Sequence, residues 1–551
     1  MPAPHADPRR SGRDRSRVAD VPGGHYDAVV TGAGAGGLTA ALTLAREGAR
    51  TLLLEKNPYV GGYAHGDGER GFYWDHGGHI LLAFRLGMPA RQVFERLGID
   101  QRIEMVPDLQ TFQCVFPDGR TEIPADLTMA AEQLSKRYPA ERHGITRLLL
   151  SMERMVAELD LVVPSFRIAD VPGQRRPLDR VLEQFQRPWL GDAVAPLAGR
   201  LGLPGHTLLK YQNRTLQQML DEHLRDPDLK AILSMLCVGI GTAPSELSAV
   251  IASVFLVHAL RLMWMPKGGF GRLAEVLREM FVEAGGTVVT GAEVDRMLVA
   301  GGRVRGVRTV DGREFTADAV VCASDARRLY TEQLPAEVVP PKLRAAVQAF
   351  PTTPAFFQVQ LGIDLNLDSA RYGGDLKRLN FVYPHRDIDK AMANFSLGNV
   401  EEAAYYLYVA TFHQPELAPP GMHSIKLECP TRLDSVGIDW DRDKDAIADS
   451  FIRRTEALIP GLRRHIVARR VHTPLDMLRR TRNDRGAFAG WAMVPQMLGR
   501  SRPQQRSPVP GLYLAGQWTT PNAGLPWVVL SGYNTAGLVL ADAGGHPRWM
   551  H

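Results

Sequence analysis

The chain has 551 residues, and its 65 Lys and Arg residues against 60 Asp and Glu residues give a formal net charge of +5. This length allows two domains with a sizeable core, and the near balance of charge excludes a nucleic-acid-binding protein, which would carry a denser basic stripe. The four cysteines are widely separated and the 16 histidines lack paired ligand spacing, which predicts free thiols in a reducing cytoplasm and no metal site.

The first 24 residues are rich in Pro, Arg, Asp and Gly and contain no apolar run, so they predict a disordered arm. No hydrophobic segment follows the pair Arg9-Arg10, which argues against an export signal. The most apolar stretch, Leu247 to Leu260, is shorter than a bilayer span and predicts a core helix or an interfacial segment. We therefore expect a cytoplasmic protein that is soluble or attached peripherally to a membrane.

Residues 26–31 predict a buried strand that leads into a glycine-rich turn and a helix of small residues. Gly32, Gly34 and Gly37 would provide, in that order, a tight turn, a close backbone approach to a pyrophosphate, and close packing of helix on strand. The helix would point its N-terminal amides at the phosphates. Glu55 ends the next predicted strand, about 20 residues beyond the turn, where a carboxylate binds ribose. Together these features predict a dinucleotide-binding Rossmann unit.

Two further glycine-rich segments indicate which dinucleotide is bound. Lys56 is soon followed by Gly61-Gly62-Tyr63-Ala64, a second glycine pair that nicotinamide enzymes do not need. Residues 511–532 predict a strand, a glycine-rich loop and a helix whose first amides would cap another polar part of a long cofactor. A Rossmann unit at one end of the chain and this unit at the other are what FAD, extended across a domain, requires.

The middle of the chain alternates between helical and strand patterns. Amphipathic runs over about 125–260 predict a helical cap over a substrate. Short alternating strands over 285–322, separated by glycine turns, predict a β-meander. Further strands are predicted at 351–362, 403–412 and 425–429, and we expect them to form a sheet floor under the substrate.

The terminal glycine motifs, the Phe72-Tyr-Trp-Asp-His-Gly-Gly-His79 segment and the Pro266-Lys-Gly-Gly269 loop resemble those of the bacterial phytoene desaturase, carotenoid isomerase and retinol saturase group of FAD-dependent oxidoreductases. The resemblance runs from about Tyr26 to about Ala541. It implies an α/β fold whose Rossmann-type FAD-binding domain is discontinuous, over 25–100, 262–330 and 505–545. An inserted mixed sheet-and-helix substrate domain with a helical cap would occupy 101–261 and 331–504. The predicted FAD-binding residues are Gly32, Gly34, Gly36, Gly37, Glu55, Lys56, Gly62, Tyr63, Gly78, Val294, Gly516, Gln517, Gly524, Pro526 and Ser531.

Hydride transfer between a flavin and a hydrocarbon needs positioning, an apolar tunnel and at most one weak base, so no catalytic triad is expected. Asp75-His76-Gly77-Gly78-His79 is the most polar cluster near the cofactor loops, and the resemblance implies that it passes close to the flavin ring. His76 and His79 are therefore the candidate acid or base. The alternative is that they hold the loop or the FAD phosphates by hydrogen bonds.

Other polar and aromatic residues carry two interpretations each. Lys267 would lie against the pyrimidine side of the flavin or be a solvated surface lysine. Gln517 stands where many related FAD enzymes carry an acid that binds the ribitol, and its amide can also bond a hydroxyl. Trp518 and Trp527 would pack in the core or form a wall of the substrate channel.

Four arginine pairs, at 453–454, 463–464, 469–470 and 479–480, predict solvated faces. If they lay on the same side as the apolar 247–265 segment, they would hold the protein at an anionic leaflet while a lipid-soluble substrate enters.

We therefore predict an FAD-dependent oxidoreductase that desaturates, saturates or isomerises an apolar polyene or isoprenoid. A flavin amine oxidase acting on a soluble amine is the first alternative, disfavoured because no acidic residue follows Gly516. A non-catalytic prenyl-lipid-binding escort protein is the second, disfavoured because the glycines and Glu55 are intact. The expected partner is an apolar small molecule, and the sequence indicates no particular oligomeric state.

Overall fold

The structure is a computed structural model, which describes residues 24–78, 80–108, 112–162, 166–168, 197–203, 205–367, 376–499 and 502–544. Almost all of the predicted N-terminal arm and part of the predicted helical cap therefore lie outside the described residues. His79, a candidate acid or base, also lies outside them.

The first sheet has seven strands in the order β10-β11-β12-β1-β2-β9, with β18 paired to β12. The strands are β1 (His25–Thr31), β2 (Thr51–Leu54), β9 (Thr287–Val289), β10 (Val294–Ala300), β11 (Arg303–Thr309), β12 (Glu314–Cys322) and β18 (Leu512–Leu514). β1 is parallel to both β2 and β12. All four residues of β2 are buried, as expected for a strand in the middle of a parallel sheet covered on both faces.

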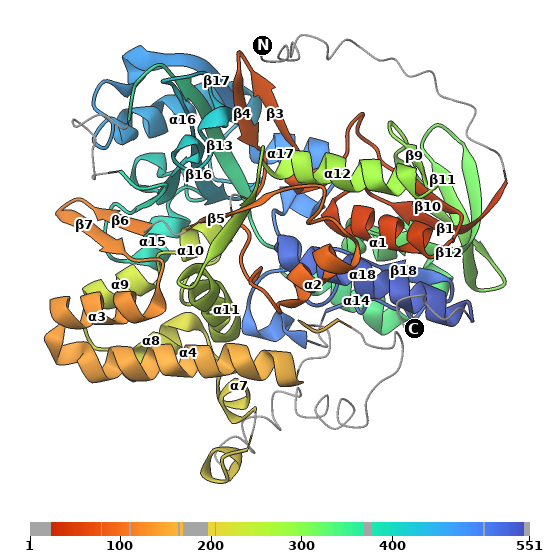
Figure 1. The fold of residues 1–551 in the computed structure, drawn as a ribbon, viewed down its shortest axis with the longest axis horizontal. Helices are drawn as coiled ribbons and strands as arrows, with labels where there is room; N and C mark the ends of the chain where they lie inside the picture. The colour runs from red at the N-terminus through yellow and green to blue at the C-terminus, as the bar shows by residue number, and fades with distance from the viewer. Residues whose placement is uncertain are drawn as a thin grey trace.

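Helices α1 (Ala35–Arg46), α12 (Phe270–Glu283) and α18 (Leu525–Asp542) pack beside one another against this sheet (Figure 1). Gly32 (φ +94°) makes the turn from β1 into α1. A side chain at Gly37 would clash with the carbonyl oxygen of Gly32, and one at Gly532 would clash with that of Gly36. Small residues thus let α1 lie close both to the end of β1 and to α18.

The strands over 285–322 differ in part from the predicted meander. β10, β11 and β12 are successive antiparallel neighbours, as a meander requires. The prediction was wrong for β9, which lies at the opposite edge of the sheet and pairs in parallel with β2. The physical reason is that β9 follows α12, which packs beside α1 on this sheet and so delivers β9 to the edge next to β2, away from β10.

The second sheet also has seven strands, in the order β17-β13-β16-β15-β14-β6-β7. They are β6 (Phe112–Phe116), β7 (Gly119–Ile123), β13 (Ala355–Ile363), β14 (Leu379–Val382), β15 (Tyr405–Val409), β16 (His423–Thr431) and β17 (Ile466–His472). Alternate residues face opposite sides: Tyr405 and Phe357 join one hydrophobic cluster, whereas Tyr406 and Phe356 join another. The first cluster includes residues of α16 (Trp440–Thr455), which covers that face.

A group of helices lies below the second sheet in the view of Figure 1. It contains α3 (Leu127–Arg137), α4 (Arg142–Val162), α7 (His206–Tyr211), α8 (Leu216–His223), α9 (Pro227–Leu233), α10 (Cys237–Ile240) and α11 (Ala249–Ala259). In α11 only Phe255 is not fully buried, so the apolar segment is a core helix and not an interfacial one. Among the described residues, no helix is long and apolar enough to cross a bilayer.

The remaining elements connect these layers. They are the hairpin of β3 (Gly66–Glu69) and β4 (Phe72–Asp75), the pair of β5 (Met105–Asp108) and β8 (Met263–Pro266), and the helices α2 (Pro89–Arg96), α13 (Ala326–Arg328), α14 (Pro341–Ala349), α15 (Ile388–Ala393) and α17 (Pro474–Thr481).

Candidate cofactor and substrate site

A cavity of about 350 Å³ is lined by residues of both sheets and of the helical group. This volume lies within the roughly 300–1,000 Å³ of a typical small-molecule site. Thirteen of the predicted cofactor-binding residues line it: Gly32, Gly34, Gly36, Glu55, Lys56, Gly62, Tyr63, Gly78, Val294, Gly516, Gln517, Gly524 and Pro526.

Gly34 forms an open cradle at the start of α1. A Cβ atom at Gly34 would meet no other atom within 4 Å, so the space beside it belongs to the cavity. The residue caps α1 with an extended backbone (φ −69°, ψ 170°), which leaves the N-terminal amides of the helix facing this space. Gly62, from the second glycine pair, approaches Gly34 from the other side. Backbone amides and the helix dipole make this a suitable place for the diphosphate of a dinucleotide.

The two predicted residues that do not line the cavity support it from behind. Gly37 permits the contact of α1 with Gly32 already described. Ser531 is buried in α18, and its Oγ accepts a hydrogen bond from the backbone N–H of Gly516 at 3.1 Å. Gly516 in turn touches α1, because a Cβ on Gly36 would lie only 2.8 Å from the Gly516 Cα.

Glu55 directly follows β2 and is almost completely buried. Its Oε2 accepts a hydrogen bond from the backbone N–H of Ala33 at 2.8 Å, and its Oε1 accepts one from the backbone N–H of Asn57 at 2.9 Å. These bonds fix the carboxylate at the wall of the cavity, beside the glycine turn. Oε1 also accepts a hydrogen bond from Asn57 Nδ2 at 2.8 Å, so Oε2 is the oxygen with a further lone pair, which suits it to accept a hydrogen bond from a ribose hydroxyl.

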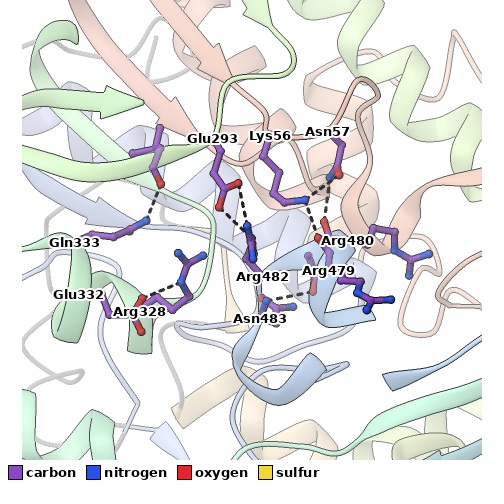
Figure 2. Close-up of polar contacts among 12 residues, drawn as sticks. Lys56, Asn57, Glu293, Arg328, Glu332, Gln333, Arg479, Arg480, Arg482 and Asn483 are labelled. Atoms are coloured by element: carbon purple, nitrogen blue, oxygen red, sulfur yellow. Dashed lines mark hydrogen bonds and ion pairs between the residues drawn. The ribbon is translucent and has the colours of Figure 1, made fainter. Parts of the chain in front are cut away.

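Cationic side chains surround this end of the cavity (Figure 2). Lys56 Nζ donates to Asn57 Oδ1 at 3.1 Å and to the backbone carbonyl of Arg479 at 2.9 Å. Arg482 pairs with Glu293, with 3.0 Å between Nε and Oε1. Arg328 also lines the cavity and pairs with Glu332 at the molecular surface. The positive charge matches the anionic diphosphate of a dinucleotide, so the residues present fit such a cofactor.

The residues of segment 479–483 were not predicted to be part of the site. Arg480, Thr481, Arg482 and Asn483 line the cavity, although they lie more than 400 residues from Lys56 in sequence. The sequence drew attention to Arg480 only as part of the pair 479–480 and not to Arg482, and no local pattern links either to the Rossmann unit.

The far part of the cavity is apolar. Its lining side chains are Ile80, Leu82, Leu236, Ile240, Phe255, Leu379, Phe381, Phe488, Met493 and Trp527, together with Tyr406. The side chains from β14 and β15 come from the sheet that was expected to form the floor of the substrate site. Such a lining favours a hydrocarbon over a charged ligand, because an unpaired charge there would lose its hydration.

His76 does not line the cavity. It is buried, with its Nε2 2.8 Å from Asp67 Oδ1 and its Nδ1 against the Arg480 guanidinium. Burial lowers the pKa of His76 to about 4, so the imidazole is neutral at pH 7. These contacts are those of a side chain that orders the loop before Gly77 and Gly78, both of which line the cavity.

Donor atoms of His65, Asp67 and His76 lie within 4.8 Å of one another. Arginines occupy this cluster, however, since Arg470 forms two bonds to Asp67 and Arg480 contacts His76. Cationic neighbours oppose the binding of a metal ion, and we assign none.

The remaining candidates are placed clearly. Lys267 is exposed and pairs with Glu104 at 2.6 Å, as a surface lysine. Trp518 lines the cavity with its indole Nε1 donating to Asn483 Oδ1 at 2.9 Å, and Trp527 lines both this cavity and a smaller apolar pocket.

Most of the apolar segment beside which the arginine pairs would act at a membrane is buried in α11. Several of these arginines are paired within the protein: Arg453 with Glu401, Arg469 with Asp449, Arg470 with Asp67 and Arg479 with Asp441.

The family model of flavin-containing amine oxidoreductases matches residues 35–540. The phytoene desaturase (lycopene-forming) of Pseudescherichia vulneris is 28% identical over 528 residues, which cover 93% of this chain and 99% of that protein. The chloroplastic prolycopene isomerase 1 of an Oncidium hybrid cultivar is 26% identical over 533 residues, which cover 94% of this chain and 84% of that protein. Wild-type putrescine oxidase bound to putrescine has a similar fold, with a TM-score of 0.63 at 13% identity, covering 94% of this chain and 100% of that one.

Proposed function

Because this chain belongs to the family of flavin-containing amine oxidoreductases, we propose that it is an FAD-dependent oxidoreductase acting on carbon–carbon bonds of an apolar polyene or isoprenoid. The family confirms the prediction of a flavin-dependent oxidoreductase, and FAD is the form of flavin that we propose. The observation that carries the proposal is the continuity of the cavity, which joins a dinucleotide cradle at Gly34 and Glu55 to an apolar compartment around Phe381.

A bound flavin would supply the hydride chemistry. The protein's own residues bind and orient the reactants. Gly34 and the N-terminus of α1 would hold the diphosphate, and Glu55 would hold the ribose. The apolar compartment would exclude water and align an extended hydrocarbon beside the bound flavin.

The named relatives support a polyene substrate. One of them is a lycopene-forming phytoene desaturase and the other a prolycopene isomerase. An apolar cavity of this kind would suit the substrate of a desaturation, a saturation or an isomerisation.

A flavin amine oxidase remains the alternative, and the fold of putrescine oxidase favours it. A soluble amine is a cation at pH 7, and its charge would lose its hydration against an apolar lining. The lining carboxylates, Glu55 and Glu293, lie at the Rossmann end, and the described residues around Phe381 include none. The second alternative, a non-catalytic escort protein, predicts a colourless protein.

The test begins with the full chain purified under conditions that retain flavin. The released chromophore is identified as FAD or FMN by chromatography. The oxidised protein is then mixed anaerobically with phytoene in liposomes, and the dithionite-reduced protein with prolycopene in liposomes. Bleaching of the flavin by phytoene or isomerisation of prolycopene supports the proposal. Bleaching by putrescine alone identifies an amine oxidase, and absence of flavin from the protein overturns the proposal.

A further inference from the structure

A buried ion pair lies behind the wall of the apolar compartment. Lys426 and Glu428, both on β16, have side chains that are 2% and 1% exposed, and Lys426 Nζ lies 3.2 Å from Glu428 Oε1. They project on the same side of β16 because they are two residues apart. Taking both charges out of water costs several kcal/mol per ion, and apolar residues would pack such a position at least as well. This cost suggests that the pair serves a purpose other than stability.

The pair is connected to the cavity by Tyr406, on the neighbouring strand β15. Tyr406 lines the cavity beside Leu379 and Phe381, and its hydroxyl donates to Glu428 Oε2. The strands are in register here, since Tyr406 and Glu428 are directly opposite each other in the β15–β16 pair. Tyr406 therefore extends from the buried carboxylate to the apolar wall.

The other groups around Glu428 hold it in place. Gln358, on β13, donates through its Nε2 to Glu428 Oε1 and to the His76 carbonyl oxygen, the latter at 3.1 Å. Lys426 Nζ donates to the carbonyl oxygens of Asp75 at 2.7 Å and Gly77 at 3.4 Å. The cluster is thus anchored to the loop that also forms part of the cavity wall.

The phenol of Tyr406 is held in its protonated form. Burial, together with the adjacent Glu428, raises the pKa of Tyr406 well above its usual value, so the phenol is protonated at pH 7. A protonated phenol can accept a proton only if it releases its own at the same time. Glu428 Oε2, which already accepts the hydrogen bond from Tyr406, is the group placed to receive it.

We propose that Tyr406 is a catalytic residue that transfers a proton between the substrate carbon and Glu428, with Lys426 and Gln358 as positioning residues. The step rests on the proposed function. In desaturation, two C–H bonds break: one hydrogen leaves as a hydride, with its electron pair, to the oxidised flavin. The other leaves as a proton to the Tyr406 oxygen while the phenol proton moves to Glu428 Oε2, and the electrons of that C–H bond form the new C=C bond. Saturation reverses each transfer.

The test compares Tyr406→Phe with a matched control, Tyr405→Phe. Tyr405 is the preceding residue of β15, and its hydroxyl contacts Thr455 Oγ1 at 3.1 Å on the opposite face of the sheet. Each full-length holoprotein is assayed for flavin content, thermal unfolding, and the anaerobic rate of flavin reduction by phytoene in liposomes. We expect Tyr406→Phe to retain its flavin and to be reduced about 100- to 10,000-fold more slowly, as when one general acid or base is lost. Tyr405→Phe should react within about twofold of wild type, because its ring is outside the cavity.

Glu428→Gln provides the second arm, because an amide keeps the shape of the carboxylate but cannot receive the proton. If the two residues act in one transfer, the double variant Tyr406→Phe/Glu428→Gln should be no slower than the slower single variant. A solvent deuterium isotope effect on flavin reduction should be present in wild type and absent in Tyr406→Phe.

Three outcomes overturn the inference: reduction of Tyr406→Phe at the wild-type rate, losses that multiply in the double variant, or loss of flavin from Tyr406→Phe, which would make the cluster structural. Failure of the proposed function is distinguishable, because in that case wild type itself is not reduced by phytoene.

Discussion

Replacing Gly34 by valine should separate cofactor binding from folding. A Cβ at this position would meet no protein atom within 4 Å, and the backbone is extended, a conformation that valine adopts readily. The unfolding free energy of the flavin-free protein should therefore change by less than about 1 kcal/mol. The side chain would, however, occupy the space that we assign to the diphosphate. Losing one charge-assisted hydrogen bond of about 1.5–3 kcal/mol weakens FAD binding roughly 10- to 150-fold.

Gly36→Val is the matched comparison, since the two glycines are two residues apart. Its Cβ would lie 2.8 Å from the Gly516 Cα and 3.1 Å from the Val528 carbonyl oxygen, so overpacking should cost about 1–3 kcal/mol of unfolding free energy. Urea unfolding of the flavin-free proteins and fluorescence titration with FAD measure the two effects. The reasoning is refuted if Gly34→Val binds FAD as wild type does, or if it is destabilised as much as Gly36→Val.

Three further substitutions test Glu55, the buried His258 and Trp527. Glu55→Gln should weaken FAD binding by about 1–3 kcal/mol in a titration, because the charged acceptor at the ribose is lost; unchanged affinity would remove Glu55 from the site. His258→Leu should flatten the pH dependence of unfolding. Burial lowers the pKa of His258 to about 3, so between about pH 6.5 and pH 3 the folded state binds fewer protons than the unfolded state. The unfolding free energy of the wild type therefore falls as the pH falls through this range, by about 1.4 kcal/mol per unit of pKa shift. Equal slopes of unfolding free energy against pH for the two proteins would contradict this. Trp527→Ala removes the ring shared by the cavity and the smaller apolar pocket. The variant should retain FAD and show a higher relative kcat/KM for longer polyenes. An unchanged chain-length preference would show that the ring only packs in the core.

The parts of the site that the sequence revealed are those made by local chemistry. The turn at Gly32 and Gly34 could be read directly, because strand, glycine turn and helix are adjacent in the chain and each has its own residue pattern. Glu55 followed from its distance to that turn. The same holds for Gly516, whose loop lies between a short strand and an apolar helix.

The parts that were missed depend on long-range pairing. Tyr406 and Glu428 were both assigned to predicted strands, but the face that each presents to the cavity depends on the β15–β16 register, which no local pattern specifies. Arg480 joins the cofactor end through contacts with Asn57 and His76, more than 400 positions earlier, and Arg482 through Glu293, 189 positions earlier. The position of β9 in the sheet was missed for a similar reason, since the pattern of a meander does not show which edge of the sheet a strand joins.

The contact between Gly36 and Gly516 has a consequence for the order in which the protein is made. Gly36 is synthesised well before β18 and α18, which complete its surroundings. Until these two elements emerge from the ribosome, β12 lacks its β18 neighbour and α1 lacks the cover of α18. The face of α1 that packs on α18 is therefore buried only late in synthesis, after α12 and the strands of the first sheet on its other side have been made.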